Sequence, residues 1–508
     1  MTPRTIFLLL AATLAASGCG KPATAVFVSS EQVKDLVRDA QRPVQSEIEQ
    51  SFGTPQNLVA WRKLPVDFGE YQGVVGTAEN ASLSSFPVTL TTKEGKPAQI
   101  DAASLKGSAI EWESGEKQTL KYELKGVEDY FQFRVASYDP EAKTLSVKTS
   151  PNVTTADAST IVPQPGEKFT IIGPVLTHGR TLYMTHCLHC HGTSGDGNGP
   201  TAQYLNPLPR DYRQGKFKFT STLQTEKVSR DDLQRVVRYG IPGTYMPSFM
   251  LLKDDEMHAI VEYVRWLALR GETEQRLIAE VAGAAGYSEA GVKQRVEGGE
   301  DRTAVLNDLK KYFAEEFAGV VDTVSSDLAD TWSRGDAPES LIIPKKKRVD
   351  DTAESRLRGR ALYLSGKAKC ATCHGPMGKG DGPQTEDYMP KPGSSEKYPV
   401  PGLHDDWGHP QLPRDLTRGI YRGGRRPLDI YRRVYAGIKG TQMPAFGGTV
   451  LTDDEIWDLV NYVMSIPFDG PGAPPKSPVA PAAPATAAIS IPSGAPGSVA
   501  SVSGNGGN

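Results

Sequence analysis

Two Cys-x-x-Cys-His motifs, at residues 187–191 and 370–374, constrain this chain more than any other feature. At this spacing two thiols lie one helical turn apart, so both can bond to the vinyl groups of one porphyrin, and the imidazole that follows can ligate the iron. The motif indicates covalent attachment of haem c. We predict two covalently bound haem c groups, attached through Cys187, Cys190, Cys370 and Cys373, with His191 and His374 as iron ligands.

Cys-x-x-Cys pairs also occur in zinc sites and in thioredoxin-like redox centres. A zinc site built from both pairs would use four sulfurs and leave the two histidines without a role. A thioredoxin motif is not expected twice in one chain, each time followed by His-Gly. Four of the 5 cysteines belong to the two motifs, so no pair remains for a structural disulfide. The haem interpretation accounts for more of the residues than either alternative.

The two motifs lie inside a longer repeat. Gly-Arg-x-Leu-Tyr precedes each motif and Gly-Asp-Gly follows it; Leu-Pro-Arg-Asp, Gly-Thr-x-Met-Pro and Leu-x-Asp-Asp-Glu then come in the same order in both copies. Such ordered self-similarity indicates that one domain has been duplicated. The second copy carries extra residues between its haem motif and Leu412.

Both copies resemble small helical cytochromes c of the His/Met type. The resemblance covers the two repeats and neither the region before them nor the region between them. It implies a helix leading into the Cys-x-x-Cys-His turn, and a last helix that crosses it by packing an aromatic residue against a glycine. Gly179 with Tyr263, and Gly359 with Tyr462, match these positions.

The resemblance also implies a methionine as the sixth iron ligand. Met246 and Met443 occupy the repeated Gly-Thr-x-Met-Pro sequence and match that position. A thioether is a soft ligand that raises the haem potential. The alternative is that each methionine is a core residue. Other candidate ligands are Met250, Met257 and Met464, and the histidines His186, His189, His258, His404 and His409, of which the last two lie in the extra segment.

Two repeated arginines, Arg210 and Arg414, follow the prolines of the Leu-Pro-Arg-Asp sequences. Each could pair with a haem propionate or with the aspartate that follows it, and the sequence leaves both open. We also expect a backbone carbonyl near Pro209 or Pro413 to accept a hydrogen bond from the haem-binding imidazole and so orient it.

The N-terminus predicts export and a lipid anchor. An apolar run from Ile6 to Ala16 follows Arg4; it is shorter than the ~20 residues that span a bilayer and fits a signal peptide. Residues 14–19 resemble a bacterial lipoprotein signal, although Ala16 stands where leucine is usual. The resemblance implies cleavage before Cys19 and lipidation of its thiol; an ordinary signal peptide with an incidental Cys19 is the alternative. We therefore expect a lipid-anchored protein of the bacterial cell envelope, facing the periplasm or the cell exterior.

The remaining segments predict a multidomain chain with two mainly α cytochrome c-like domains, an N-terminal β-rich module and a helical linker. Apolar spacing over 29–50 predicts a helix capped at Ser29, whereas residues 119–124, 129–135 and 144–148 read as strands. The predicted organisation is a signal peptide over 1–18, a tether and helix over 19–60, the β-rich module over 61–176, the first cytochrome c domain over 177–270, the helical linker over 271–352, the second cytochrome c domain over 353–468, and a disordered Pro, Ala, Gly and Ser-rich tail over 469–508.

These features predict an electron carrier rather than an enzyme. Iron with His and Met ligands has no open position for a substrate, so we expect electrons to pass between a donor and an acceptor of a bacterial respiratory chain, such as a terminal oxidase. The resemblance also allows a cytochrome subunit of a larger respiratory complex. A formal net charge of -3 gives no nucleic-acid footprint. The alternatives are a di-haem peroxidase or related oxidoreductase, which needs a displaceable iron ligand, and a haem-based sensor, which needs an output domain.

Overall fold

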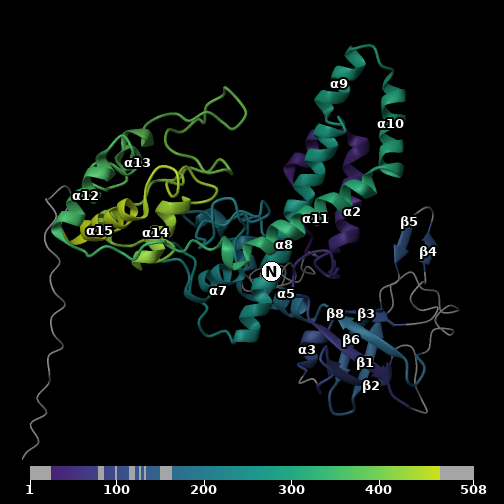
Figure 1. Ribbon diagram of the computed structural model, residues 1–508. Coiled ribbons are helices and arrows are strands. Elements are labelled where there is room, and N and C mark those ends of the chain that lie inside the picture. Colours follow the sequence, from purple (N-terminus) through teal and green to yellow (C-terminus); the bar gives the residue numbers. More distant parts are fainter. Residues whose placement is uncertain are drawn as a thin grey trace, which may run out of the picture.

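A computed structural model gives the architecture of the chain (Figure 1). The predicted signal peptide, Cys19 and the tail after Asp469 lie outside the described residues. In the part of the chain that is described, no helix is both long and apolar enough to cross a bilayer. The structure describes residues 25–77, 85–97, 100–113, 121–124, 127–130, 133–148 and 163–469.

The β-rich module is a closed antiparallel barrel with the strand order β1-β2-β7-β6-β3-β8. The predicted strand at 129–135 falls on two strands, because β5 pairs with β4 in a separate hairpin while β6 joins the barrel. The strands are β1 (Glu70–Val75), β2 (Ser85–Thr92), β3 (Ala109–Trp112), β4 (Lys121–Leu124), β5 (Val127–Tyr130), β6 (Phe133–Asp139), β7 (Thr144–Lys148) and β8 (Lys168–Ile172).

Aromatic side chains fill the barrel. Trp112 packs on Phe169 with 5.2 Å between ring centroids, and Phe86 and Phe133 pack edge-on around this pair. Gly73 faces the same ring, because a Cβ at this position would lie 2.2 Å from Cζ of Phe169. Since large rings occupy the interior, the barrel forms a solid core of its own.

The predicted N-terminal helix is interrupted. A short 3₁₀ helix η1 (Glu31–Asp35) precedes α2 (Arg38–Phe52). The expected Ser29 cap was wrong, since the hydroxyl of Ser30 accepts the hydrogen bond from the Gln32 amide, at 3.3 Å. The helix breaks at Val37 because its amide donates to the carbonyl of Tyr287, 3.1 Å away, instead of to the preceding turn.

Each cytochrome-like repeat folds into a small helical domain. The first domain contains α5 (Pro174–His186), α6 (Leu188–His191), η3 (Ala202–Tyr204), α7 (Arg230–Tyr239) and α8 (Asp254–Ala279). The second domain contains α12 (Ala353–Leu364), α13 (Cys370–His374), η6 (Pro383–Thr385), η7 (Leu416–Arg418), α14 (Pro427–Ala436) and α15 (Asp453–Asp469).

The first and last helices of each domain cross where the sequence predicts. A Cβ on Gly179 of α5 would lie 2.0 Å from the carbonyl oxygen of Ala259 in α8 and 2.9 Å from Cβ of Tyr263. At the equivalent crossing of α12 and α15, a Cβ on Gly359 would lie 2.1 Å from the carbonyl oxygen of Asp458. Only glycine lets the backbones approach this closely. The predicted glycine–aromatic crossing is confirmed in both domains.

The segment between the two domains packs on the first one. It contains the π-helix η4 (Glu280–Ala284), α9 (Glu289–Glu297), α10 (Arg302–Glu315), α11 (Phe317–Gly335) and η5 (Pro338–Ser340). Residues of α2, α8 and α11 share a single hydrophobic core. Within it, the buried Trp332 of α11 donates from Nε1 to Glu272 of α8, at 3.0 Å. These helices therefore extend the body of the first domain.

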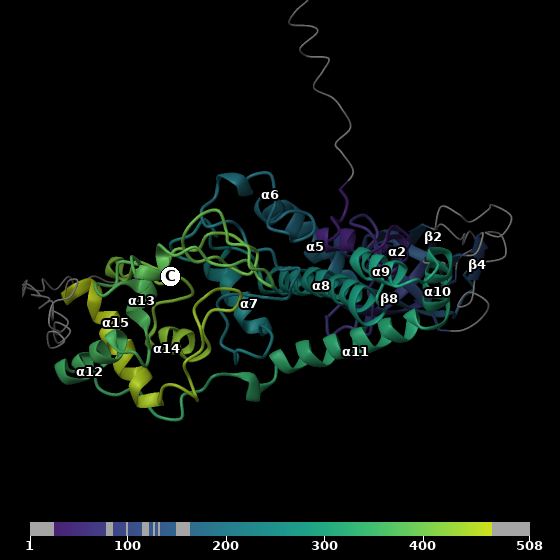
Figure 2. The ribbon, with the colours of Figure 1, turned by 90° about the horizontal axis from the view of Figure 1, so that it is seen from above.

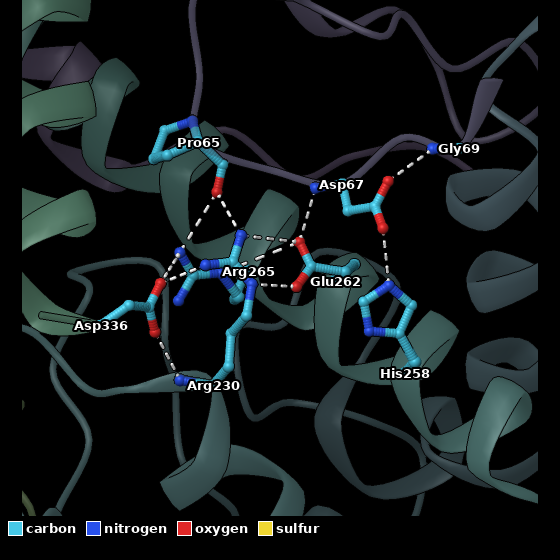
Figure 3. A network of polar contacts seen from close by, with 8 residues as sticks. All are labelled: Pro65, Asp67, Gly69, Arg230, His258, Glu262, Arg265 and Asp336. Atoms are coloured by element: carbon cyan, nitrogen blue, oxygen red, sulfur yellow. Dashed lines mark hydrogen bonds and ion pairs between the residues drawn. The ribbon is translucent and has the colours of Figure 1, made fainter. Parts of the chain in front are cut away.

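The first helical domain lies between the second domain and the barrel (Figures 1 and 2). A partly buried polar network ties the segment before β1 to helices α7, α8 and α11 (Figure 3). Glu262, which is fully buried, accepts from the Asp67 amide at 2.8 Å and from Arg230 at 2.6 Å. Arg265 contacts Asp336 at 3.1 Å and the Pro65 carbonyl at 3.2 Å. The predicted fold class, two mainly α cytochrome c-like domains with an N-terminal β-rich module and intervening helices, is confirmed.

Candidate functional site

Both Cys-x-x-Cys-His motifs form a short helical turn that ends at a glycine. In the first domain the His191 amide donates to the Cys187 carbonyl at 2.9 Å. Gly192 then adopts φ 74° and Gly375 adopts φ 73°, a left-handed conformation that glycine tolerates best. A Cβ on Gly192 would lie 2.0 Å from Oδ1 of Asp196, and Gly375 meets Asp381 in the same way. The repeated His-Gly sequence is thus required by the turn itself.

The two haem-binding histidines are held by backbone carbonyls. Nδ1 of His191 lies 3.2 Å from the carbonyl oxygen of Arg210, and Nδ1 of His374 lies 3.1 Å from that of Arg414. A carbonyl can only accept, so Nδ1 carries the proton and Nε2 keeps its lone pair free for iron. Burial lowers the pKa of both imidazoles, which favours the neutral, ligating form. The predicted carbonyl contact is present, although it belongs to the residue after each proline.

The two candidate methionines stand in loops with matching hydrogen bonds. In the first domain the Met246 amide donates to Oγ1 of Thr244 at 3.1 Å, and the Met246 carbonyl accepts from the Ile241 amide at 3.1 Å. In the second domain Met443 makes the same two contacts, with Thr441 at 3.3 Å and with Ile438 at 3.1 Å. The repeated Gly-Thr-x-Met-Pro sequence therefore encodes one loop shape, used twice.

One cavity of about 480 Å³ joins the two domains. All eight predicted haem-binding side chains line it: Cys187, Cys190, His191, Met246, Cys370, Cys373, His374 and Met443. The other methionine candidates lie elsewhere, since Met250 is exposed, Met257 is buried within α8 and Met464 packs against the second domain's core. The fold thus brings each Cys-x-x-Cys-His motif and a single repeated methionine per domain into one space.

Of the five other histidines considered as ligands, His186 and His189 line the cavity beside the first motif, and three do not. His404 is 2% exposed; its ring stacks on Tyr398 with 3.9 Å between centroids, and its Nδ1 contacts the Gly402 carbonyl at 3.0 Å. His409 faces Asp405, and His258 contacts Asp67 at 2.9 Å (Figure 3). These three contacts give His258, His404 and His409 structural roles.

The cavity also contains buried cationic side chains. Arg210, Arg422 and Arg433 line it, and burial lowers the pKa of Arg210 and of Arg433 to about 10 because a charge there is poorly solvated. The buried Nε atom of Arg422 has no hydrogen-bond partner among the described residues. Asp211 pairs with Arg213 at 2.8 Å, and the carboxylates of Asp405, Asp211 and Asp406 partly offset the effect of burial on the pKa of Arg210. Such a set of cations suits an anionic ligand.

The donor set fits haem c. Two thiols per motif can form the thioether bonds, a neutral imidazole and a thioether can ligate iron, and the arginines can take the propionates of a porphyrin. Burial raises the pKa of Cys187 and of Cys370 to about 12, so both are protonated thiols in the chain without haem. Within the described ranges no three His, Cys, Asp or Glu side chains come together as a metal site.

Comparison with known proteins agrees with this geometry. Residues 176–268 and residues 357–467 both match the family model of cytochrome c. The chain contains two cytochrome c domains. Such domains bind haem covalently and serve haem-based electron transfer, which is the function that the two segments support.

Among solved structures, a chain of the reducing HAO-like protein complex of Kuenenia stuttgartiensis is similar to this one. It is 25% identical, and the match covers 57% of this chain and 95% of that chain, with a TM-score of 0.38. No curated protein matches significantly.

Several residues in or beside the cavity were not anticipated from the sequence. Arg433 stands where the first cytochrome domain has Val236, so the repeat gave no signal for it, whereas Arg422 takes the place of Lys218, a second cation that lines the cavity. Trp407 lies in the extra segment of the second cytochrome domain, and its ring lies under the guanidinium of Arg210, 3.9 Å from Cζ to the ring centroid. The extra segment could have drawn attention because an insertion that carries a large aromatic residue often serves a contact.

Proposed function

We propose that this chain is a di-haem cytochrome c that transfers electrons through two covalently bound haem c groups in one shared cavity. The observation that carries the proposal is that all eight predicted haem-binding side chains line the same cavity. When bound, haem supplies reversible one-electron transfer at iron. The cysteine pairs would tether it, and the neutral His191 and His374 would ligate it through Nε2.

Met246 and Met443 would complete the coordination, so neither site keeps a position for a substrate. This supports an electron carrier over a di-haem peroxidase. A peroxidase would require an open or displaceable ligand at one iron, for example through an exchange of Met443 for a histidine under some condition. His404 is stacked on Tyr398 and His409 faces Asp405, so neither is poised for that exchange.

We also propose that the protein works in a bacterial respiratory chain. It would be anchored by a lipid on Cys19 and face the periplasm or the cell exterior, with redox proteins such as a terminal oxidase as partners. This part is supported by the pattern of residues 4–19, an export and lipidation signal, together with the tandem cytochrome c domains. Lipidation would appear as an added acyl mass on the mature protein that is lost in the Cys19→Ser variant, and an unmodified cysteine would exclude the anchor.

The central experiment is to express the chain together with a c-type haem maturation system. We expect a mass increase of two haem groups per chain that survives denaturation, and no CO binding to the reduced protein. Covalent haem with CO binding at one site would instead favour a peroxidase or a sensor. A protein without covalent haem would refute the proposal.

A further inference from the structure

The extra segment of the second cytochrome domain provides one of the links between the two domains, beside the ion pair of Arg235 with Asp429. In the first domain Lys216 pairs with Asp406, and Lys218 donates to Gln411 at 3.0 Å. The same segment is attached to the methionine loop of its own domain, because the Asp406 amide donates to the Gly440 carbonyl at 3.2 Å. The insertion therefore links the first domain to the ligand loop of the second.

Arg210 lies at this junction and faces both sites. Its carbonyl holds the imidazole of His191 at 3.2 Å, within the first domain. Its guanidinium stacks on Trp407 of the second domain. A Cβ on Gly440, three residues before Met443, would lie 2.6 Å from the Trp407 ring and 3.5 Å from Nη1 of Arg210. One residue thus contacts the histidine of one site and borders the methionine loop of the other.

Arg414 makes the reciprocal arrangement. Its carbonyl holds His374 at 3.1 Å in the second domain. Its Nη2 atom reaches the first domain, where it lies 2.9 Å from the position that a Cβ on Gly243 would take. Gly243 stands three residues before Met246, as Gly440 does before Met443. Nε of Arg414 donates to the Ile420 carbonyl at 2.7 Å, which fixes the direction of the side chain.

We propose that Arg210 and Arg414 are crossed positioning residues that couple the two haem sites, so that each guanidinium sets the redox potential of the site in the other domain as well as its own. The inference rests on the proposed function, since it requires a redox group at both sites. A cation near a redox centre disfavours the oxidised form, which carries one more positive charge, and so raises the potential. Most of the side chains that line the cavity are apolar, so they screen this charge less than water would.

The sequence alone shows two arginines in equivalent places, each expected to serve its own domain. The crossing follows from the way the domains are joined. It gives the pair a function that a single cytochrome domain lacks, since it makes the potential of one site depend on a side chain of the other.

The test is a redox titration of the full-length holoprotein, with each site followed through its own paramagnetically shifted haem-methyl NMR signals. The signals are assigned from the set that moves in a Met443→His variant. In Arg210→Gln the carbonyl that holds His191 remains, while the charge that reaches the second domain is lost. We expect the potentials of both sites to fall, and Arg414→Gln to lower both in the same way. The two potentials of Arg210→Lys should lie between those of Arg210→Gln and those of the unaltered protein, because lysine keeps the charge and loses the stacking guanidinium.

Arg418→Gln is the matched control. Arg418 is a cation of the second domain whose side chain is 71% exposed and pairs with Asp415 of the same domain. Removal of the Arg418 charge should leave the redox potentials of both sites unchanged. The inference is overturned if Arg210→Gln shifts the first site alone, or if Arg418→Gln shifts the second site as much as Arg210→Gln does. If scattering shows that Arg210→Gln separates the domains, Arg414→Gln decides, through its effect on the first site.

The two proposals fail in different ways. A chain without two covalent haem groups refutes the proposed function before any titration is made. A chain with both groups, in which neither arginine variant shifts the site of the other domain, refutes the coupling and leaves the proposed function standing.

Discussion

The hydroxyl of Tyr212 donates a hydrogen bond to the hydroxyl of Tyr183, at 2.6 Å, inside the first cytochrome domain. Tyr183 in turn donates to the carbonyl of Gly192, at 2.8 Å, just after the haem motif. The second domain keeps the equivalent bond from Tyr363 to the Gly375 carbonyl, at 2.8 Å, but has Leu416 in place of Tyr212. The two repeats therefore support the same turn with different numbers of hydroxyl groups.

This difference predicts a ranking of stabilities. Tyr212→Phe should lower the unfolding free energy by about 1 kcal/mol, because it removes one hydrogen bond while Tyr183 keeps its bond to Gly192. Tyr183→Phe should cost more, since it leaves both the Tyr212 hydroxyl and the Gly192 carbonyl without their partner. Tyr363→Phe is the control, and it should lower the unfolding free energy by less than Tyr183→Phe does. Urea unfolding followed by circular dichroism measures the ranking, and an equal cost for Tyr183→Phe and Tyr363→Phe would contradict it.

The helix crossings predict strong sensitivity at two glycines. Gly179→Ala would place a Cβ 2.0 Å from a backbone oxygen of α8, and Gly359→Ala would do the same at α15, at 2.1 Å. A backbone cannot move aside as a side chain can, so we expect each change to cost at least the ~1–3 kcal/mol typical of overpacking. Gly319→Ala in α11 is the matched control, because a Cβ there meets nothing within 4 Å. It should be neutral or stabilising by about 0.5–1 kcal/mol. The melting temperatures of the three variants test this prediction.

His258 and Asp67 form an ion pair between α8 and the segment that leads into β1 (Figure 3). The hydrogen bond to Asp67 raises the pKa of His258 above its ordinary value of 6.5, and the same bond lowers the pKa of Asp67 below 3.8. The pair is therefore complete between pH 4 and pH 6. The contribution of His258 is lost as the pH rises through its elevated pKa, and that of Asp67 is lost as the pH falls through its depressed pKa.

His258→Gln should accordingly destabilise the protein most at mildly acidic pH and least above neutral pH. Both side chains are about half exposed, so we expect a cost of ~1 kcal/mol or less at low salt and less at high salt. Asp67→Asn removes the partner of His258, so the stability of this variant should lose the same pH dependence. The measurement is the melting temperature of each variant from pH 5 to pH 8, and a deficit that grows with pH would contradict the assignment.

The methionine loops predict which side chains ligate iron. Met246→Ala in the holoprotein should remove half of the far-red band that marks sulfur bound to ferric haem, and should allow one CO to bind after reduction. Met443→Ala should have the same effect at the other site. Met464→Leu, outside the cavity, is the control and should leave the band intact. An unchanged band in either alanine variant would show that the deleted thioether is not an iron ligand.

The parts of the site that could be predicted are those encoded by short patterns of consecutive residues. The Cys-x-x-Cys-His motifs, the Met-Pro loops and the glycine–tyrosine crossings are local patterns repeated in one chain, so the residues alone specified them. The β-rich module was also predictable, since alternating apolar residues indicate strands, whereas the pairing of β5 with β4 and of β6 with the barrel was not. Strand pairing depends on partners far along the chain, and periodicity carries no record of them.

The sequence by itself determined that this chain has two cytochrome c domains and predicted the residues of each that line the cavity. Only the tertiary structure decided that these sites open into one cavity, that Arg210 and Arg414 cross between the domains, and that His404 is a packing residue rather than a ligand. The physical reason is that covalent attachment and turn geometry are short-range, encoded within a few consecutive residues. The burial and electrostatics of a shared cavity arise only when two separate cores are joined, here in part by the extra segment that carries Trp407 and Asp406.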